Sequence, residues 1–315
     1  MEDRIYSYIN GNYYVSLSSD GTKIYRTLRV GESPISKFPD SIDLKITNKC
    51  SIGCSFCHES SNPLGKSFDV DKTIKILDKL PKVGIEVAIG GGDITEDSSF
   101  KDLLKLLSWM SNNNFVSRLT INSKSLKNLT EDKLKDICEF TDSFGISINN
   151  IQEYHYASNY FDNSVAKFSY TIVYHIIAGI FPITDIKNLI NQDRSTYRRI
   201  LILGYKNFGR AFGNPPKYDL SEWEKELKLS ISDAKGNRDL VIGFDNLAID
   251  QLGIKSLFSE KEWGSKYMGN EFTHSMYVDA VSEEFAPTSR DTFRVSWDNI
   301  DIINFFNKYK NKNEN

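Results

Sequence analysis

A hydrophobic run long enough to cross a membrane is missing from this sequence of 315 residues. The longest apolar stretch covers residues 170–183, includes His175, and falls short of the roughly 20 residues that a membrane-spanning helix needs. Residues 1–14 mix charged side chains with tyrosine and asparagine and lack the apolar segment of a signal peptide. We therefore expect a soluble protein of the cytoplasm, with no membrane partner.

A marked excess of one charge is also missing. The 39 Lys and Arg residues oppose 42 Asp and Glu residues, which gives a formal net charge of -3 and an isoelectric point near 5.9. Proteins that coat nucleic acids usually carry a basic excess, so this balance argues against a nucleic-acid partner but leaves room for a local basic groove. The length suits one large domain or one domain with appendages, and the 40% share of hydrophobic residues is enough for a sizeable core.

Cysteine is scarce, and its few positions are unevenly spread. The chain has four cysteines, of which Cys50, Cys54 and Cys57 fall within one short segment. A secreted disulfide framework would distribute its cysteines along the chain. In a cytoplasmic protein a tight cluster is typical of metal binding instead.

From residue 42 onward, short β-branched runs alternate with amphipathic segments. Strands are expected at residues 42–47, 84–89, 117–122, 144–149, 169–177, 200–204 and 240–244. Helices are expected at residues 70–80, 100–111, 131–140, 151–161, 184–191 and 221–230, the last with a capping-box pattern at Ser221 and Glu224. Strand–helix alternation is typical of a parallel sheet covered by helices, and repeated right-handed crossovers curl such a sheet into a barrel. The predicted fold is therefore α/β, a partial (β/α)6 TIM-like barrel with ligand sites at the carboxyl ends of its strands.

Two flanking segments divide the chain into three predicted parts. Residues 1–41 form a short N-terminal β-hairpin extension, with a turn at Asp20 and Gly21. Residues 42–250 form the partial barrel, and residues 251–315 form a small C-terminal cap and tail. The cap contains strand candidates at 275–281 and 292–296 and a helix candidate at 300–309, and residues 311–315 should fray.

The three clustered cysteines directly follow the first predicted barrel strand. Their spacing is C-x3-C-x2-C, with Phe56 just before the last cysteine. Three thiolates on one short loop can bind three corners of a four-iron cluster and leave the fourth iron open, as a catalytic metal centre requires. The alternatives are a zinc site with His58 as fourth ligand, or a ferredoxin-like carrier with Cys138 as fourth ligand. Cys138 lies on a predicted helix, where a lone cysteine is typical of core packing.

With this loop in this position, the sequence resembles the radical S-adenosylmethionine (radical SAM) superfamily over about residues 42–247. The resemblance implies that Cys50, Cys54 and Cys57 hold a [4Fe–4S] cluster whose open iron chelates S-adenosylmethionine (SAM). It further implies reductive cleavage of SAM to a 5′-deoxyadenosyl radical, which abstracts a hydrogen atom from a substrate. An electron donor such as flavodoxin or ferredoxin is implied as a partner.

Further segments resemble the SAM-binding parts of that family. A glycine run ends the next strand and matches the Gly-Gly-Glu position, with the shorter Asp93 in place of glutamate and expected to attract the SAM ammonium. Polar residues end the third and fourth strands, and a backbone segment ends the sixth, where the family binds adenine. The candidate SAM-binding residues are Gly91, Gly92, Asp93, Asn122, Ser147, Asn149, Leu203 and Gly204. For any one of the polar residues, simply ending a strand is the alternative.

His175 and Asp245 are the candidates for contact with the substrate. Asp245 follows the last predicted strand, and a charge at the carboxyl end of a barrel strand is typical of a ligand site. His175 lies within an apolar strand, whose alternate residues face the inside of a barrel. A satisfied histidine of the core is the alternative.

The C-terminal region contains no cysteine. A cysteine-ligated auxiliary cluster is thereby excluded from it. We favour a peptide or protein side chain as substrate, because the C-terminal strands could pair with an extended chain. A nucleotide or small metabolite is the alternative substrate, and a non-catalytic iron–sulfur or zinc redox-sensing module is the alternative function.

Overall fold

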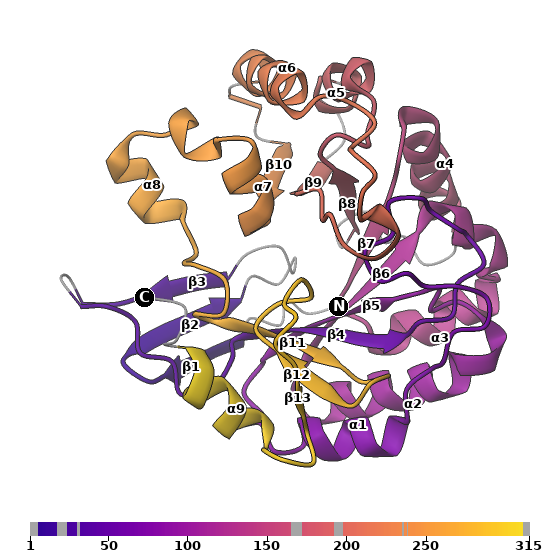
Figure 1. The fold of residues 1–315 in the computed structure, drawn as a ribbon, viewed down its shortest axis with the longest axis vertical. Helices are drawn as coiled ribbons and strands as arrows, with labels where there is room; N and C mark the ends of the chain where they lie inside the picture. Colours follow the sequence, from indigo (N-terminus) through magenta and orange to yellow (C-terminus); the bar gives the residue numbers. More distant parts are fainter. Residues whose placement is uncertain are drawn as a thin grey trace.

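The computed structural model describes residues 6–17, 24–29, 32–164, 172–191, 198–234, 236–237 and 239–310. Its centre is a curved parallel sheet whose strands alternate along the chain with helices on the outside (Figure 1). The strands are β4 (Ser41–Thr47), β5 (Glu86–Gly91), β6 (Val116–Asn122), β7 (Ser143–Ser147), β8 (Ile172–Ile177), β9 (Arg198–Leu203) and β10 (Leu240–Phe244). The helices between them are α1 (Val70–Leu77), α2 (Asp97–Asn112), α3 (Glu131–Phe140), α4 (Ile151–Asp162), α5 (Ile183–Ile190) and α6 (Leu220–Asp233).

The seven strands lie side by side in chain order, and each pairs in parallel with its neighbour. Two 3-10 turns, η1 (Ser123–Asn128) and η2 (Gly209–Ala211), follow β6 and β9. The predicted α/β partial barrel is therefore confirmed. Of the strand expected at residues 169–177, the part before Ile172 lies outside the described residues.

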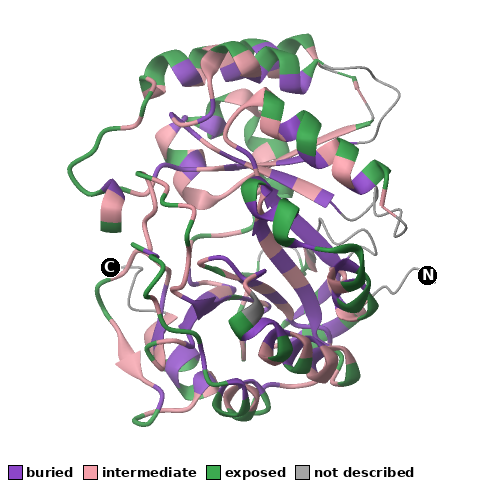
Figure 2. Cartoon of the chain, turned by 90° about the vertical axis from the view of Figure 1, so that its right-hand side faces the viewer, coloured by how far each residue is buried: buried purple, intermediate pink, exposed green. Residues whose placement is uncertain are grey.

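The alternation of side chains along β4 shows how each strand divides its residues between two faces. Ile42, Leu44 and Ile46 are buried in the layer between the sheet and the helices. Asp43 and Lys45 point the other way, toward the inside of the barrel. Figure 2 shows the result, with buried strands at the centre and exposed outer faces on the helices.

Helix α6 begins earlier than the capping-box pattern at Ser221 predicts. The side chain of Asp219 accepts hydrogen bonds from the backbone N–H groups of Ser221 and Glu222, so Asp219 is the N-cap. A carboxylate two residues upstream competes successfully because it satisfies two free N–H groups of the first turn. None of the helices in the described residues is long and apolar enough to cross a membrane.

The C-terminal region adds a strand to the barrel sheet. After α7 (Asn246–Gln251), η3 (Ile254–Leu257) and α8 (Glu260–Lys266), strand β11 (Ser275–Asp279) pairs in parallel with β4, on the side away from β5. β12 (Glu284–Ala286) and β13 (Val295–Ser296) continue the sheet in antiparallel pairing, and α9 (Ile302–Tyr309) follows. Both edges of β4, the first strand of the barrel, are therefore paired, with β5 on one side and β11 on the other.

The N-terminal region forms a separate antiparallel sheet of three strands, β1 (Tyr6–Asn10), β2 (Tyr13–Leu17) and β3 (Ile24–Thr27). The predicted hairpin corresponds to β2 and β3, and its predicted turn at Asp20 and Gly21 lies outside the described residues. The additional strand β1 was not expected from the sequence.

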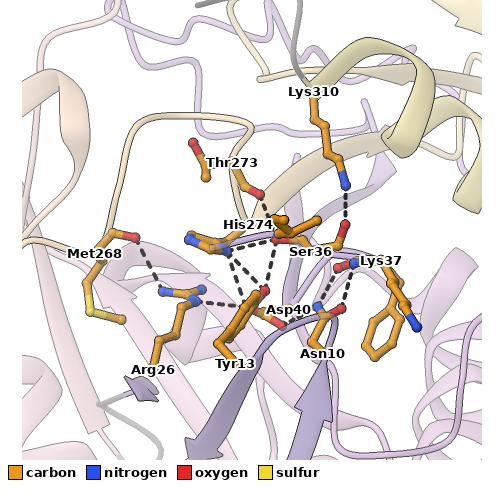
Figure 3. A network of polar contacts seen from close by, with 12 residues as sticks. Asn10, Tyr13, Arg26, Ser36, Lys37, Asp40, Met268, Thr273, His274 and Lys310 are labelled. Atoms are coloured by element: carbon orange, nitrogen blue, oxygen red, sulfur yellow. Dashed lines mark hydrogen bonds and ion pairs between the residues drawn. The ribbon is translucent and has the colours of Figure 1, made fainter. Parts of the chain in front are cut away.

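One buried carboxylate joins this small sheet to the barrel (Figure 3). Asp40, just before β4, has no exposed surface and accepts hydrogen bonds from Asn10 of β1 (2.8 Å), Tyr13 of β2 (2.9 Å) and Arg26 of β3 (2.7 Å). The backbone N–H of Asp40 donates to the carbonyl oxygen of His274 (2.7 Å), just before β11. Each N-terminal strand thus contributes at least one side chain to a single anchor between the first and the last parallel strand.

Candidate active site at the carboxyl ends of the strands

The three clustered cysteines lie on the loop that leaves β4 at the carboxyl edge of the sheet. All three thiols border one cavity of about 170 Å³, together with Gly91 and Gly92 at the end of β5. The loop turns through Gly53, whose φ of 71° lies in the left-handed region that glycine adopts without strain. The sequence therefore places three sulfur donors and a glycine run around one space.

The glycines are required by the close approach of two backbones. A Cβ atom on Gly91 would lie 2.4 Å from the carbonyl oxygen of Thr47, and one on Gly92 would lie 2.1 Å from that of Lys49. The backbone N–H of Gly92 donates to the Thr47 oxygen (2.7 Å), and that of Asp93 donates to the Lys49 oxygen (2.7 Å). Any larger side chain would push the glycine run away from the cysteine loop.

Arg210, from the η2 turn after β9, holds the same loop from the opposite side. Its Nε donates to the carbonyl oxygen of Cys54 (3.0 Å), a terminal nitrogen donates to the carbonyl oxygen of Ser61, and its backbone N–H donates to the carbonyl oxygen of Cys57 (3.0 Å). The guanidinium thus links two points of the loop to the sixth barrel strand. This contact cannot be predicted from the sequence, because a charged residue on a loop has no local pattern that identifies its partner.

Most of the residues expected to bind SAM line this cavity. Beyond the cysteines and the two glycines, the cavity is bordered by Asn122, Ser147, Asn149, His175 and Leu203. They come from the ends of β6, β7, β8 and β9, which meet at one edge because the strands are parallel. Asp93, Gly204 and Asp245 do not border it.

The side chain of Asp93 is directed away from the cavity and is almost fully buried. One carboxylate oxygen accepts from the backbone N–H (3.0 Å) and the hydroxyl (2.7 Å) of Thr95. The other oxygen accepts from the hydroxyl of Ser125 (2.7 Å), on the turn after β6. Asp93 thus fastens the glycine run to the next βα unit, and the lost methylene relative to glutamate explains why its carboxylate stops short of the cavity.

Gly204 and Asp245 bond to each other. The backbone N–H of Gly204 donates to a carboxylate oxygen of Asp245 (2.9 Å), which also accepts from the backbone N–H of Ala248 and so caps α7. A Cβ on Gly204 would lie 2.4 Å from Leu247, so the glycine permits α7 to pack against β9. Asp245 borders a second and larger cavity deeper in the barrel.

His175 borders both cavities. Its ring lies across Gly145 of β7, where a Cβ atom would come within 2.3 Å of the imidazole. Burial lowers the pKa of His175 to about 4, so the imidazole is neutral at physiological pH. The residue therefore separates the two cavities as an uncharged polar group.

A buried group of charges supports the cysteine loop from the β11 side. Glu59, just after the cysteines, lies 2.7 Å from the Lys45 ammonium, which also contacts Asp279 of β11 at 3.0 Å. Tyr277 of β11 donates its hydroxyl hydrogen to Glu59 (2.9 Å). Burial alone would raise the pKa of the Glu59 carboxyl, but the hydrogen bond from His58 and the Lys45 charge outweigh it and hold the pKa below its usual range.

The donor set suits an iron–sulfur cluster. Within the described residues, no three His, Cys, Asp or Glu side chains converge on the position of a single metal ion. A cubane does not require convergence, because it presents a separate iron to each of three thiolates. Three soft sulfur ligands around a partly enclosed cavity, with loop carbonyls held by Arg210, fit such a cluster.

Comparisons with known proteins agree with this geometry. The Sporulation killing factor maturation protein SkfB of Bacillus subtilis (strain 168) is 32% identical over 83 residues, which are 26% of this chain and 20% of that protein. A structure of SuiB from Streptococcus suis bound to S-adenosylmethionine aligns with 97% of this chain and 87% of its own, at a TM-score of 0.69 and 10% identity. A second SuiB structure, bound to the precursor peptide SuiA, aligns with 86% of this chain and 65% of its own, at a TM-score of 0.65 and 13% identity.

The match to SkfB spans about a fifth of that protein, and the likeness to SuiB establishes the shared fold alone. The family assignment comes from the segment that carries the site. Residues 44–172 match the model of the Radical SAM superfamily, and this segment contains all three clustered cysteines and the glycine run. The part of the chain that carries the cysteine loop and the glycine run is therefore a radical SAM domain.

Proposed function

We propose that this protein cleaves SAM reductively and that the resulting radical removes a hydrogen atom from a peptide or protein side chain. The observation that carries the proposal is the single cavity that joins Cys50, Cys54 and Cys57 to the strand-end residues. When bound, a [4Fe–4S] cluster would supply the electron that splits SAM into methionine and the 5′-deoxyadenosyl radical.

The chain's own residues bind and orient the reactants. Cys50, Cys54 and Cys57 would ligate the cluster through their thiolates. Gly91 and Gly92 have no side chains, so the methionyl end of SAM could approach their backbone closely. Asn122, Ser147 and Asn149 offer hydrogen bonds to the ribose and carboxylate, and Leu203 gives an apolar surface for the adenine.

The surroundings keep competing reactions away from the radical. Ile52, Phe56, Ile148 and Ile177 also border the cavity, and their apolar side chains would limit the access of water to it. His175, neutral at physiological pH, adds a polar edge without a charge. A dry, shaped site is what the protein contributes to radical chemistry.

Support for a peptide substrate comes from the relatives. SkfB is named as a maturation protein, and SuiB has been solved with its precursor peptide SuiA. A larger cavity of about 470 Å³, which shares His175 with the SAM cavity, is spacious enough for a long side chain.

The direct test is SAM cleavage by anaerobically reconstituted protein. The reconstituted protein should contain about four irons per chain. Incubation with SAM and dithionite should yield 5′-deoxyadenosine. Replacing any of Cys50, Cys54 or Cys57 with alanine should remove the cluster and the cleavage together, whereas Cys138→Ala should retain both. Zinc in place of iron, or iron without 5′-deoxyadenosine, would favour a non-catalytic module instead.

A further inference from the structure

A second cavity occupies the interior of the barrel below the SAM cavity. It has a volume of about 470 Å³ and is bordered by the inward residues of β4 to β6 and β8 to β10, and by the segments before β11 and after β12. Its lining includes an unusual number of charged groups, which are Arg26, Asp43, Glu86, Arg118, Arg199, Lys206, Asp245, Glu271 and Arg290. His175 marks its boundary with the SAM cavity.

Most of these charges already have partners in the protein. Arg118 forms an ion pair with Glu86 (2.7 Å), and Arg290 pairs with Glu271. Arg26 is bound by Asp40 (2.7 Å) as part of the anchor in Figure 3. Asp245 is occupied in capping α7. These groups shape the wall and are not available to a ligand without breaking an existing contact.

Asp43 differs from all of them. Within the described residues, its carboxylate has neither a hydrogen bond nor an ion pair, and its side chain is exposed to the cavity. Its neighbours across the sheet are Ala88 on β5, which has no polar side chain, and Tyr277 on β11, whose hydroxyl bonds to Glu59. A carboxylate that faces the cavity without a partner in the protein is free to bind a cationic ligand.

The electrostatic surroundings agree with that reading. The pKa of the Asp43 carboxyl is raised to about 6, chiefly by burial; among the nearby charges Lys206 acts most strongly and lowers it, whereas Glu86, Asp245 and Glu271 raise it. Lys206 is itself hydrogen-bonded to Ser289 (2.9 Å). A cationic ligand would pair with the Asp43 carboxylate, whereas an anionic ligand would be repelled by it.

We propose that Asp43 binds a cationic group of the substrate, a primary ammonium or guanidinium at the end of a long flexible side chain. This inference rests on the proposed function, because it treats the deeper cavity as the substrate site of the same enzyme. Asp43 pairs in register with Ala88, three residues before Gly91, which places it about 10 Å below the SAM cavity along the strands. A side chain entering past His175 must be long to reach it.

The test compares two small probes on the reconstituted protein with cluster and SAM. Nα-acetyl-lysine methylamide carries the ammonium, and Nα-acetyl-norleucine methylamide has a straight alkyl chain without it. Calorimetric titration should show the lysine derivative binding about ten- to a hundred-fold more tightly, the range expected for a charge-assisted hydrogen bond in an enclosed site. Asp43→Asn should abolish the preference, and Asp136→Asn, on the exposed face of α3, should keep it.

Three outcomes separate this inference from the proposed function. Equal affinity for the two probes, no measurable binding of the lysine derivative, or a preference that survives in Asp43→Asn overturns the role of Asp43. Tighter binding of an acidic analogue, Nα-acetyl-glutamate methylamide, would assign the cavity to Lys206 instead. Production of 5′-deoxyadenosine by the same wild-type preparation is measured in parallel, and its absence counts against the proposed function alone. Circular dichroism and iron content establish that each variant is folded and loaded.

Discussion

Replacing Asp43 with asparagine should make the folded protein more stable at neutral pH. The carboxyl has a pKa of about 6 in the folded chain, because burial disfavours its charged form, whereas an aspartate in an unfolded chain titrates near about 4. Between these two values the folded protein holds a proton that the unfolded chain releases. Stability therefore falls as the pH rises from about 4 to about 6, and the loss is complete above that window.

The size of the effect follows from the shift. A difference of about two pKa units corresponds to about 3 kcal/mol at most, and the water in the cavity screens the charge, so a gain of about 1–2 kcal/mol is the realistic expectation for the asparagine variant. Asparagine keeps the shape of aspartate and removes the charge, so no packing change accompanies it. For a chain of this length the melting temperature should rise by about 2–4 °C.

Thermal unfolding of both anaerobic proteins, followed by circular dichroism at pH 5 and pH 7.5, measures this difference. The asparagine variant should exceed the wild type clearly at the higher pH and much less at the lower one, and Asp136→Asn should match the wild type at both. A variant that is less stable at pH 7.5, or a gap that does not depend on pH, would refute the reasoning. Either result would mean that a partner inside the folded protein compensates the Asp43 charge.

Three further substitutions test the contacts around the site. Asp93→Asn should lower the free energy of unfolding by less than about 1 kcal/mol and leave SAM affinity unchanged, since an amide can accept from Thr95 and donate to Ser125. Asp93→Ala should lower the free energy of urea unfolding by about 2–4 kcal/mol, because it leaves buried donors unpaired. Arg210→Lys should lower the iron retained after anaerobic gel filtration, because a lysine cannot donate to two separated carbonyls from a rigid planar group. Full iron retention would mean that the cysteine loop keeps its conformation without the Arg210 contacts. Cys138→Ala should lose about 1 kcal/mol of stability for a small cavity, and a loss of iron would instead make this buried thiol a ligand.

The barrel could be predicted because its signals are local. Each strand from β4 to β10 carries a β-branched run, and each intervening helix has its own apolar stripe, so the alternation identifies the fold without any long-range information. The pairing of β11 with β4 lies beyond such reasoning. These two strands are far apart in the sequence, and nothing in Ser275–Asp279 indicates which edge it joins.

Site residues could be predicted where their spacing in the sequence identifies them. They could not be predicted where their role depends on partners that are distant in the sequence. The cysteine triplet and the glycine run can be recognised from their spacing and their positions after successive strands. Asp43 and Lys45 alternate with Ile42 and Leu44, which locally resembles a half-exposed strand. Only the folded barrel places Asp43 at the deeper cavity and buries Lys45 against Glu59 and Asp279. Asp93 is the converse case, because its family position suggests a ligand contact while Thr95 and Ser125 already occupy its carboxylate.

The Asp40 anchor also has a consequence for the order in which the chain folds. The successive βα units from β4 to β10 make contacts between neighbouring segments, which can form early and quickly. The Tyr13–His274 hydrogen bond joins residues 261 positions apart, and the loop that it closes includes the whole barrel. We therefore expect the cysteine loop and the SAM cavity to take shape while the deeper cavity is still open at its lower end. During synthesis, that end can close only after β11 has been made, so the substrate chamber should be the last part of the molecule to become native.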